Sequence, residues 1–70
     1  MGIVEDLLSA MQTAYEHYLA AKASARAARE RGSDRRAAYH EARAQNFKKR
    51  ENFFRKLLRE RRERQQGRRQ

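Results

Sequence analysis

Apolar residues in the first half of the chain recur at alternating steps of three and four, the heptad pattern of a helix that packs against another helix. This first seam runs without a slip through Val4, Leu7, Met11, Ala14, Tyr18, Ala21, Ala25 and Ala28. The pattern predicts one long helix over about residues 3–30, with its apolar side turned toward a partner helix.

A second seam with more polar members occupies the other half: Ala37, His40, Ala44, Phe47, Glu51, Phe54, Leu58 and Arg61. It predicts a helix over about residues 34–64. Gly32 stands between the seams and can adopt the left-handed conformation that follows a helix C-terminus. Because a short turn makes consecutive helices antiparallel neighbours, we expect an all-α fold. The expected architecture is an antiparallel two-helix hairpin with its turn at 31–33. It forms a single domain over 1–64, followed by a basic frayed tail at 65–70.

Facing residues in an antiparallel hairpin have position numbers that add to a nearly constant value, and a value of 65 pairs the two seams consistently. Alanines then meet mostly small residues near the turn, whereas Tyr18 meets Phe47 at the wider end. The helices should therefore approach closely at the turn and diverge toward the termini. The same register predicts an interhelical ion pair between Asp6 and Arg59.

The apolar surface is wider than one partner helix can cover. Ile3 lies beside the first seam, and further apolar residues flank both seams. Those that we expect at an oligomer or partner interface are Leu8, Tyr15, Leu19, Tyr39, Phe53 and Leu57. A symmetric homodimer forming a four-helix bundle would bury them. The alternative is that they form a docking site for another protein, and we favour the dimer.

Charge is distributed unevenly along the 70 residues, whose formal net charge is +9. Residues 1–21 contain three acidic and no basic residues, while residues 34–70 contain fourteen basic and five acidic residues. This asymmetry favours an anionic partner. The chain has no cysteine, no apolar run long enough for a membrane span and no basic start of a signal peptide, so we expect a cytoplasmic protein.

Candidate chemistry is sparse, and we expect a protein that is not an enzyme and uses no metal or cofactor. His17 and His40 have no further ligands at metal-binding spacing, and no phosphate-cradling glycine loop or nucleophile elbow occurs. Glu51 falls among aromatic residues, where a buried charge needs a partner. We expect its carboxylate to accept a hydrogen bond from the hydroxyl of Tyr15 or Tyr18.

Basic residues form a row along the second predicted helix, at steps that keep them on one side and roughly opposite the aromatic residues of the seam. A row of about 20 Å, at 1.5 Å rise per residue, suits a nucleic-acid backbone. Arginine predominates, and its planar fork favours phosphate and RNA. The candidate nucleic-acid-binding residues are Lys48, Lys49, Asn52, Arg55, Lys56, Arg59 and Arg62.

Three other interpretations of this row stay open: an acidic protein surface as the partner, a solvated helix face, and an anionic membrane, which ranks last. The expected architecture resembles the plasmid-encoded RNA modulators, dimeric helical hairpins that clamp paired RNA loops. It also resembles the basic hairpin of some phage scaffolding proteins, which implies an acidic capsid partner. We expect a regulatory homodimer that binds nucleic acid, with RNA favoured over DNA. The alternative is a phage- or plasmid-type adaptor or inhibitor that docks on an acidic protein surface.

Overall fold

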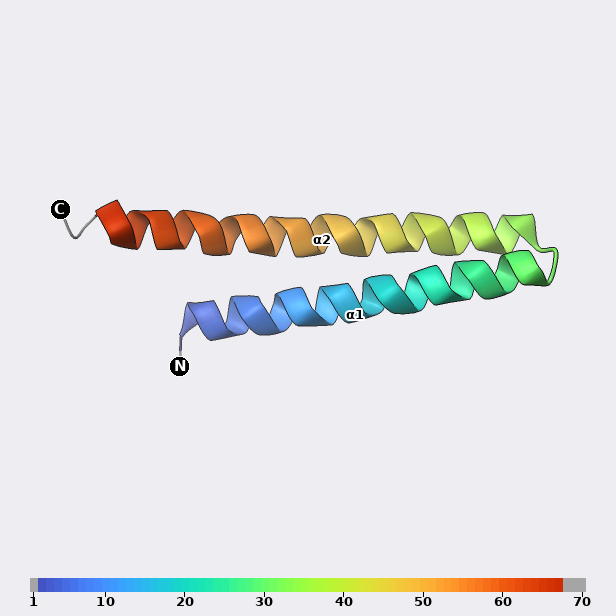
Figure 1. Cartoon of the computed structure of the whole chain (residues 1–70), viewed down its shortest axis with the longest axis horizontal. Helices are drawn as coiled ribbons and strands as arrows, with labels where there is room; N and C mark the ends of the chain where they lie inside the picture. Colours follow the sequence, from blue (N-terminus) through green and yellow to red (C-terminus); the bar gives the residue numbers. More distant parts are fainter. Residues whose placement is uncertain (1, 68–70) are drawn as a thin grey trace.

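A computed structural model describes residues 2–67 of the protein as two helices, α1 (Ile3–Glu30) and α2 (Asp34–Gly67). The helices run antiparallel side by side and form an elongated hairpin of 58 × 20 × 11 Å (Figure 1). The predicted all-α hairpin is therefore confirmed, with both helix starts and the end of α1 where the seams placed them. The four-helix bundle stays a prediction.

The turn forms because Gly32 can take a backbone conformation that other residues rarely adopt. Its φ is +79°, in the left-handed region. The N–H of Gly32 donates to the carbonyl of Arg29 at 3.0 Å, and the N–H of Ser33 donates to that of Ala28 at 2.9 Å. This pair of bonds is the Schellman arrangement, which satisfies the last carbonyls of α1. The N–H of Ala37 then donates to the carbonyl of Ser33 at 3.0 Å and starts α2.

The far end of α2 differs from the expected boundary. Helix α2 continues through Gln65, Gln66 and Gly67, three residues beyond the predicted end at residue 64. Good helix formers at 65 and 66 explain this extension. The remainder of the predicted tail, residues 68–70, lies outside the described residues.

Alanines make the buried seam. Each of the following is less than a tenth exposed: Ala14, Ala21, Ala25, Ala28, Ala37 and Ala44. The larger seam residues Leu7, Met11, Tyr18, Phe47 and Phe54 are half-buried. Small side chains let the backbones approach near the turn, and large ones hold them apart at the open end, so the helices diverge toward the termini (Figure 1).

Two details of the predicted pairing differ in the structure. The ring of Phe47 packs edge-on against His17, with 4.9 Å between ring centroids, whereas the ring of Tyr18 lies beneath the ammonium of Lys48. The rings of Tyr18 and Phe47 therefore point to opposite sides of the contact between the two helices. Asp6 and Arg59 are both exposed, and no ion pair joins them, because they lie at the divergent end of the hairpin.

Candidate nucleic-acid interface

The hairpin has two broad faces, which the neighbours of Ala14 define on α1. Ala14 is buried against α2, and successive helix residues are turned by about 100°. Thr13 and Tyr15 therefore point to opposite sides of the hairpin. Tyr15 lines a surface hollow of about 310 Å³ together with Gln12 and Arg55. Thr13 lines a second hollow, of about 280 Å³, together with Phe47 and Arg50.

The same argument divides α2 around Glu51, which faces α1 and is 3% exposed. Its neighbours Arg50 and Asn52 are turned in opposite directions. Arg50 and Phe47 line the same hollow as Thr13, so Asn52 projects on the side of Tyr15. We call these two sides the Phe47 face and the Tyr15 face.

Apolar side chains of α1 are uncovered on the Tyr15 face. Leu8, Tyr15 and Leu19 follow at steps of seven and four and are all exposed. They form the α1 strip. The ring of Tyr15 stacks against that of Tyr18 at 6.3 Å between centroids.

The predicted basic row does not keep to a single side of α2. Asn52, Arg55 and Arg59 flank the seam on the Tyr15 face. Lys49 and Lys56 are turned away from α1, because they lie two and five residues from the buried Glu51.

Glu51 accepts hydrogen bonds from Lys48 Nζ at 3.0 Å and from Arg55 Nη2 at 2.8 Å. The expectation that a tyrosine hydroxyl would satisfy Glu51 was therefore wrong. A charged hydrogen bond is about twice as strong as a neutral one, so nearby cations are the better partners.

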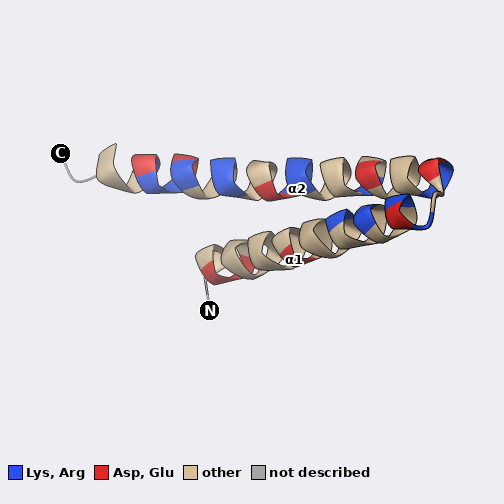
Figure 2. Ribbon diagram, turned by 45° about the vertical axis from the view of Figure 1, so that its right-hand side comes forward, with Lys and Arg blue, Asp and Glu red and all other residues tan. Residues whose placement is uncertain are grey.

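The remaining members of the row are exposed and make no hydrogen bond or ion pair within residues 2–67. These members, which we call the open row, are Lys49, Asn52, Lys56, Arg59 and Arg62. Basic residues recur along the whole of α2, whereas the half of α1 near the N-terminus has none (Figure 2).

The Phe47 face carries a feature that sequence analysis missed, an alternation of aromatic rings and guanidinium groups on α2. Arg43 lies 5.8 Å from the ring centroid of Tyr39 and 5.9 Å from that of Phe47. Arg50 lies 5.8 Å from the Phe47 centroid on the other side along the chain. Steps of three and four between these residues were the available signal.

The apolar residues predicted for an oligomer or partner interface are thus divided between two faces. Tyr39 belongs with Arg43 on the Phe47 face, and Leu57 lies there too, seven residues after Arg50. Phe53 packs edge-on against Phe54, which lines the Phe47 hollow, with 5.8 Å between centroids. Since the α1 strip is on the Tyr15 face, one flat partner surface cannot cover both sets.

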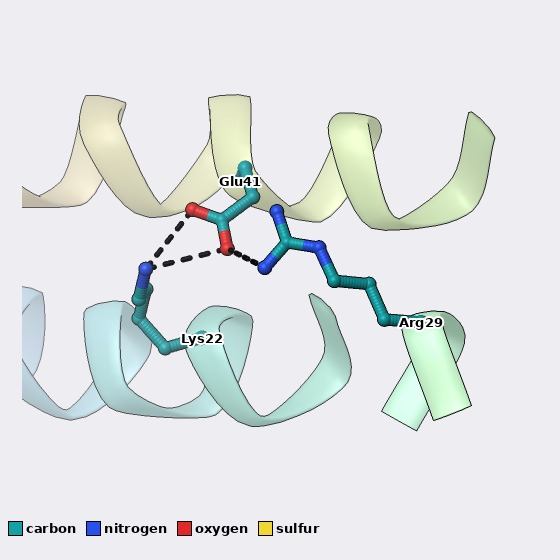
Figure 3. Close-up of polar contacts among 3 residues, drawn as sticks. All are labelled: Lys22, Arg29 and Glu41. Atoms are coloured by element: carbon teal, nitrogen blue, oxygen red, sulfur yellow. Dashed lines mark hydrogen bonds and ion pairs between the residues drawn. The ribbon is translucent and has the colours of Figure 1, made fainter. Parts of the chain in front are cut away.

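An ion-pair cluster joins the helices nearer the turn (Figure 3). Lys22 Nζ donates to both carboxylate oxygens of Glu41, at 3.0 and 3.3 Å, and Arg29 Nη1 lies 3.3 Å from one of them. The hydrogen bond from Lys22, together with the charges of Lys22 and Arg29, holds the pKa of Glu41 below its ordinary value of 4.5. This cluster links the two helices and partly neutralises one acidic charge, and because its members are partly exposed, its contribution to stability is small.

Neither histidine has the surroundings of a metal ligand. His17 packs on Phe47, and His40 Nδ1 lies 3.3 Å from Arg43 Nη1. Within the described part of the chain, no three His, Asp or Glu side chains gather closely enough to bind a metal ion. Among residues 2–67, neither helix combines the length and apolar character that crossing a membrane requires.

Comparisons of the chain with protein-family models, with curated protein sequences and with solved structures found no match.

Proposed function

We propose that this protein is a non-enzymatic regulator that binds nucleic acid through α2, with structured RNA as the preferred ligand. The observation that carries the proposal is the open row. Four cations and one amide project from one helix without a partner among the described residues. An exposed cation that is not neutralised internally is free to replace a counterion on a phosphate backbone.

The length and chemistry of the open row suit a polyanion. From Lys49 to Arg62 it spans about 20 Å at 1.5 Å per residue. The charges follow a straight helix and therefore match successive phosphates rather than a single anionic group. Asn52 adds an amide that can reach a phosphate or a base edge.

We further propose that the protein acts as a homodimer joined through the α1 strip. Packing α1 against α1 of the partner would bury Leu8, Tyr15 and Leu19, and it would keep the two basic α2 helices apart. The alternative through α2 would bring like charges together, which costs free energy. The dimer would then present two open rows, one on each α2 helix.

The test is an anisotropy titration of a labelled RNA hairpin and of a DNA duplex, each at two salt concentrations. Arg59→Ala and Lys56→Ala should each weaken binding of both ligands similarly and lower the salt slope by about one phosphate contact. Arg26→Ala is the matched control, because Arg26 is an exposed cation on α1. It should change the affinity by less than about twofold.

Glu51→Met gives a variant with the opposite expected sign. It removes the carboxylate that holds Lys48 and Arg55, so two more cations become available and affinity and salt slope should both rise. Absence of binding to either nucleic acid at low salt would contradict the proposed function.

The second candidate function is docking on an acidic protein surface, and the Tyr15 face favours it. There, the uncovered Leu8 and Leu19 lie on the same side as cations of α2. Interfaces of this kind depend on a few buried aromatic or arginine residues. Alanine variants along the row would then differ strongly from one another, and nucleic acid would not bind.

A further inference from the structure

The Phe47 face of α2 exposes aromatic rings to an unusual degree. Tyr39 is 63% exposed and Phe53 is 56% exposed, although a large ring gains free energy when it leaves water. Between these two rings along the helix lie Arg43, Phe47 and Arg50. The guanidinium group of Arg43 lies near the rings of Tyr39 and Phe47, and that of Arg50 lies near the ring of Phe47. We call this surface the aromatic–arginine strip; its members are Tyr39, Arg43, Phe47, Arg50, Phe53 and Phe54.

The strip is built as an alternation along one helix. Arg43 is placed between the rings of Tyr39 and Phe47, and Arg50 follows beyond Phe47. His17 supports Phe47 from α1. From Tyr39 to Phe53 the strip extends about 21 Å at 1.5 Å per residue.

This combination of groups matches an unpaired nucleotide segment. A flat exposed ring can stack on the face of a base, and a neighbouring guanidinium can bind the phosphate beside it. A base inside a duplex has both faces covered by its neighbours and offers none to Tyr39 or Phe53. The ligand chemistry of the strip is therefore that of single-stranded RNA or DNA, or of a loop with splayed bases.

A second copy of the chain fits the strip poorly. The two acidic residues between Tyr39 and Leu57 are occupied elsewhere, since Glu41 pairs with Lys22 and Glu51 with Lys48. Self-association through this strip would therefore set arginines against arginines with no carboxylate between them. Like charges in contact disfavour such a complex.

We propose that the aromatic–arginine strip is a binding site for unpaired nucleotides, and that it borders, at Phe53, the open row that holds the backbone of a paired segment. This inference rests on the proposed function. It assigns two kinds of nucleic-acid structure to two surfaces of α2. A loop and its adjoining stem would engage the protein together through these surfaces.

The experiment compares a single-stranded oligonucleotide of about 12 bases carrying 2-aminopurine, within known site sizes for single-strand binding, with a duplex of the same sequence. Tyr39→Ala and Phe53→Ala should each weaken binding of the single strand about 5-fold to 150-fold, the range for loss of one stacked base. The duplex affinity should change by less than about twofold. Stacking should also quench 2-aminopurine fluorescence, and Tyr39→Phe should keep the quenching because it keeps the ring.

Ile3→Ala is the matched control, because Ile3 is an exposed apolar residue of α1 that belongs neither to the aromatic–arginine strip nor to the α1 strip. Thermal melts followed by circular dichroism verify that the variants stay folded. If the single strand binds the Ala variants as tightly as the original protein, the strip is not a base-stacking site, while duplex binding that needs Arg59 still supports the proposed function. If neither ligand binds the original protein, both proposals fail.

Discussion

Glu41 and Glu51 are the two carboxylates that the described hairpin holds between cations, and their settings differ. Glu41 bridges the helices and is 24% exposed, whereas Glu51 is paired within α2 and is 3% exposed. A pair across helices registers one element against the other. A pair within one helix neutralises a buried charge but transmits no such constraint.

The Glu41 cluster predicts a specific pH dependence of folding stability. Because the folded pKa of Glu41 is lowered from 4.5, its contribution to stability is complete above that value and is lost as pH falls through the folded pKa. Lowering the pH from about 6 to about 3 should therefore reduce the melting temperature of the original protein more than that of Glu41→Gln, as measured in thermal melts. Equal pH dependence in the two proteins would show that the cluster does not couple to folding.

Arg61 predicts a stabilising substitution. It occupies the last position of the second seam, and its Nε is buried without a hydrogen-bond partner among residues 2–67. A buried donor left unsatisfied costs about 1–3 kcal/mol. Arg61→Leu should raise the free energy of unfolding in urea by about 1 kcal/mol, and Arg64→Leu, an exposed change of the same type nearby, should not.

At the scale of the helices, the seam of alanines decides how closely α1 and α2 pack. Ala25 is 0% exposed, so any larger side chain there pushes the backbones apart. Ala25→Leu should lower the free energy of unfolding by about 1–3 kcal/mol. Ala20→Leu places the same side chain on the exposed side of α1 and should be nearly neutral. Similar losses for both variants in denaturant titrations would contradict close packing.

The turn predicts a cost for any side chain at Gly32. No atom lies within 4 Å of the position that a Cβ would take, so the cost of Gly32→Ala comes from the φ of +79° alone. The left-handed conformation costs a residue with a Cβ about 1–2 kcal/mol, so Gly32→Ala should lower the free energy of unfolding by that amount. Gly32→Asn should cost less, since asparagine tolerates the left-handed conformation. Gly67→Ala should stabilise the protein slightly, because Gly67 is helical and a Cβ there would meet no other atom. Urea unfolding would rank the three variants.

The seams and the turn were predictable because periodicity and glycine report on backbone geometry, which few other factors override. The side-chain partners were not. Phe47 could have met Tyr18 or His17 from nearly the same register, and only the available space on each side decides. Tyrosines and cations both lay within reach of Glu51, so its hydrogen-bond partners depended on side-chain rotamers, which no sequence pattern encodes. The aromatic–arginine strip was missed because its rings were divided between two predicted roles. Tyr39 and Phe53 were assigned to an apolar interface, and Phe47 and Phe54 were assigned to the seam.

The molecule as a whole separates its charge from its uncovered aliphatic surface. Residues 1–21 carry no basic residue, and the α1 strip lies within them. On helix α2, the open row extends from the Tyr15 face to the side turned away from α1, and the aromatic–arginine strip lies on the Phe47 face. Each surface can therefore contact a different partner at the same time.

This separation predicts which substitutions dissolve the proposed dimer. Sedimentation equilibrium at roughly 50 µM, where mass action favours association, should give twice the monomer mass of 8.4 kDa. The double variant Leu8→Gln with Leu19→Gln should give the monomer mass. Phe53→Gln is the control on the opposite face and should remain dimeric. A monomeric original protein would exclude the bundle.

The seam changes from small side chains near the turn to large ones near the termini, and this change also sets the order in which the parts of the hairpin unfold. Contacts beside the three-residue turn close the shortest loops and lose the least chain entropy, so they form first and persist longest. Local unfolding therefore begins at the termini, where Leu8 is exposed and the helices are farthest apart. A partner bound to the α1 strip would clamp the weakest part of the hairpin, so association and the completion of folding would be thermodynamically linked.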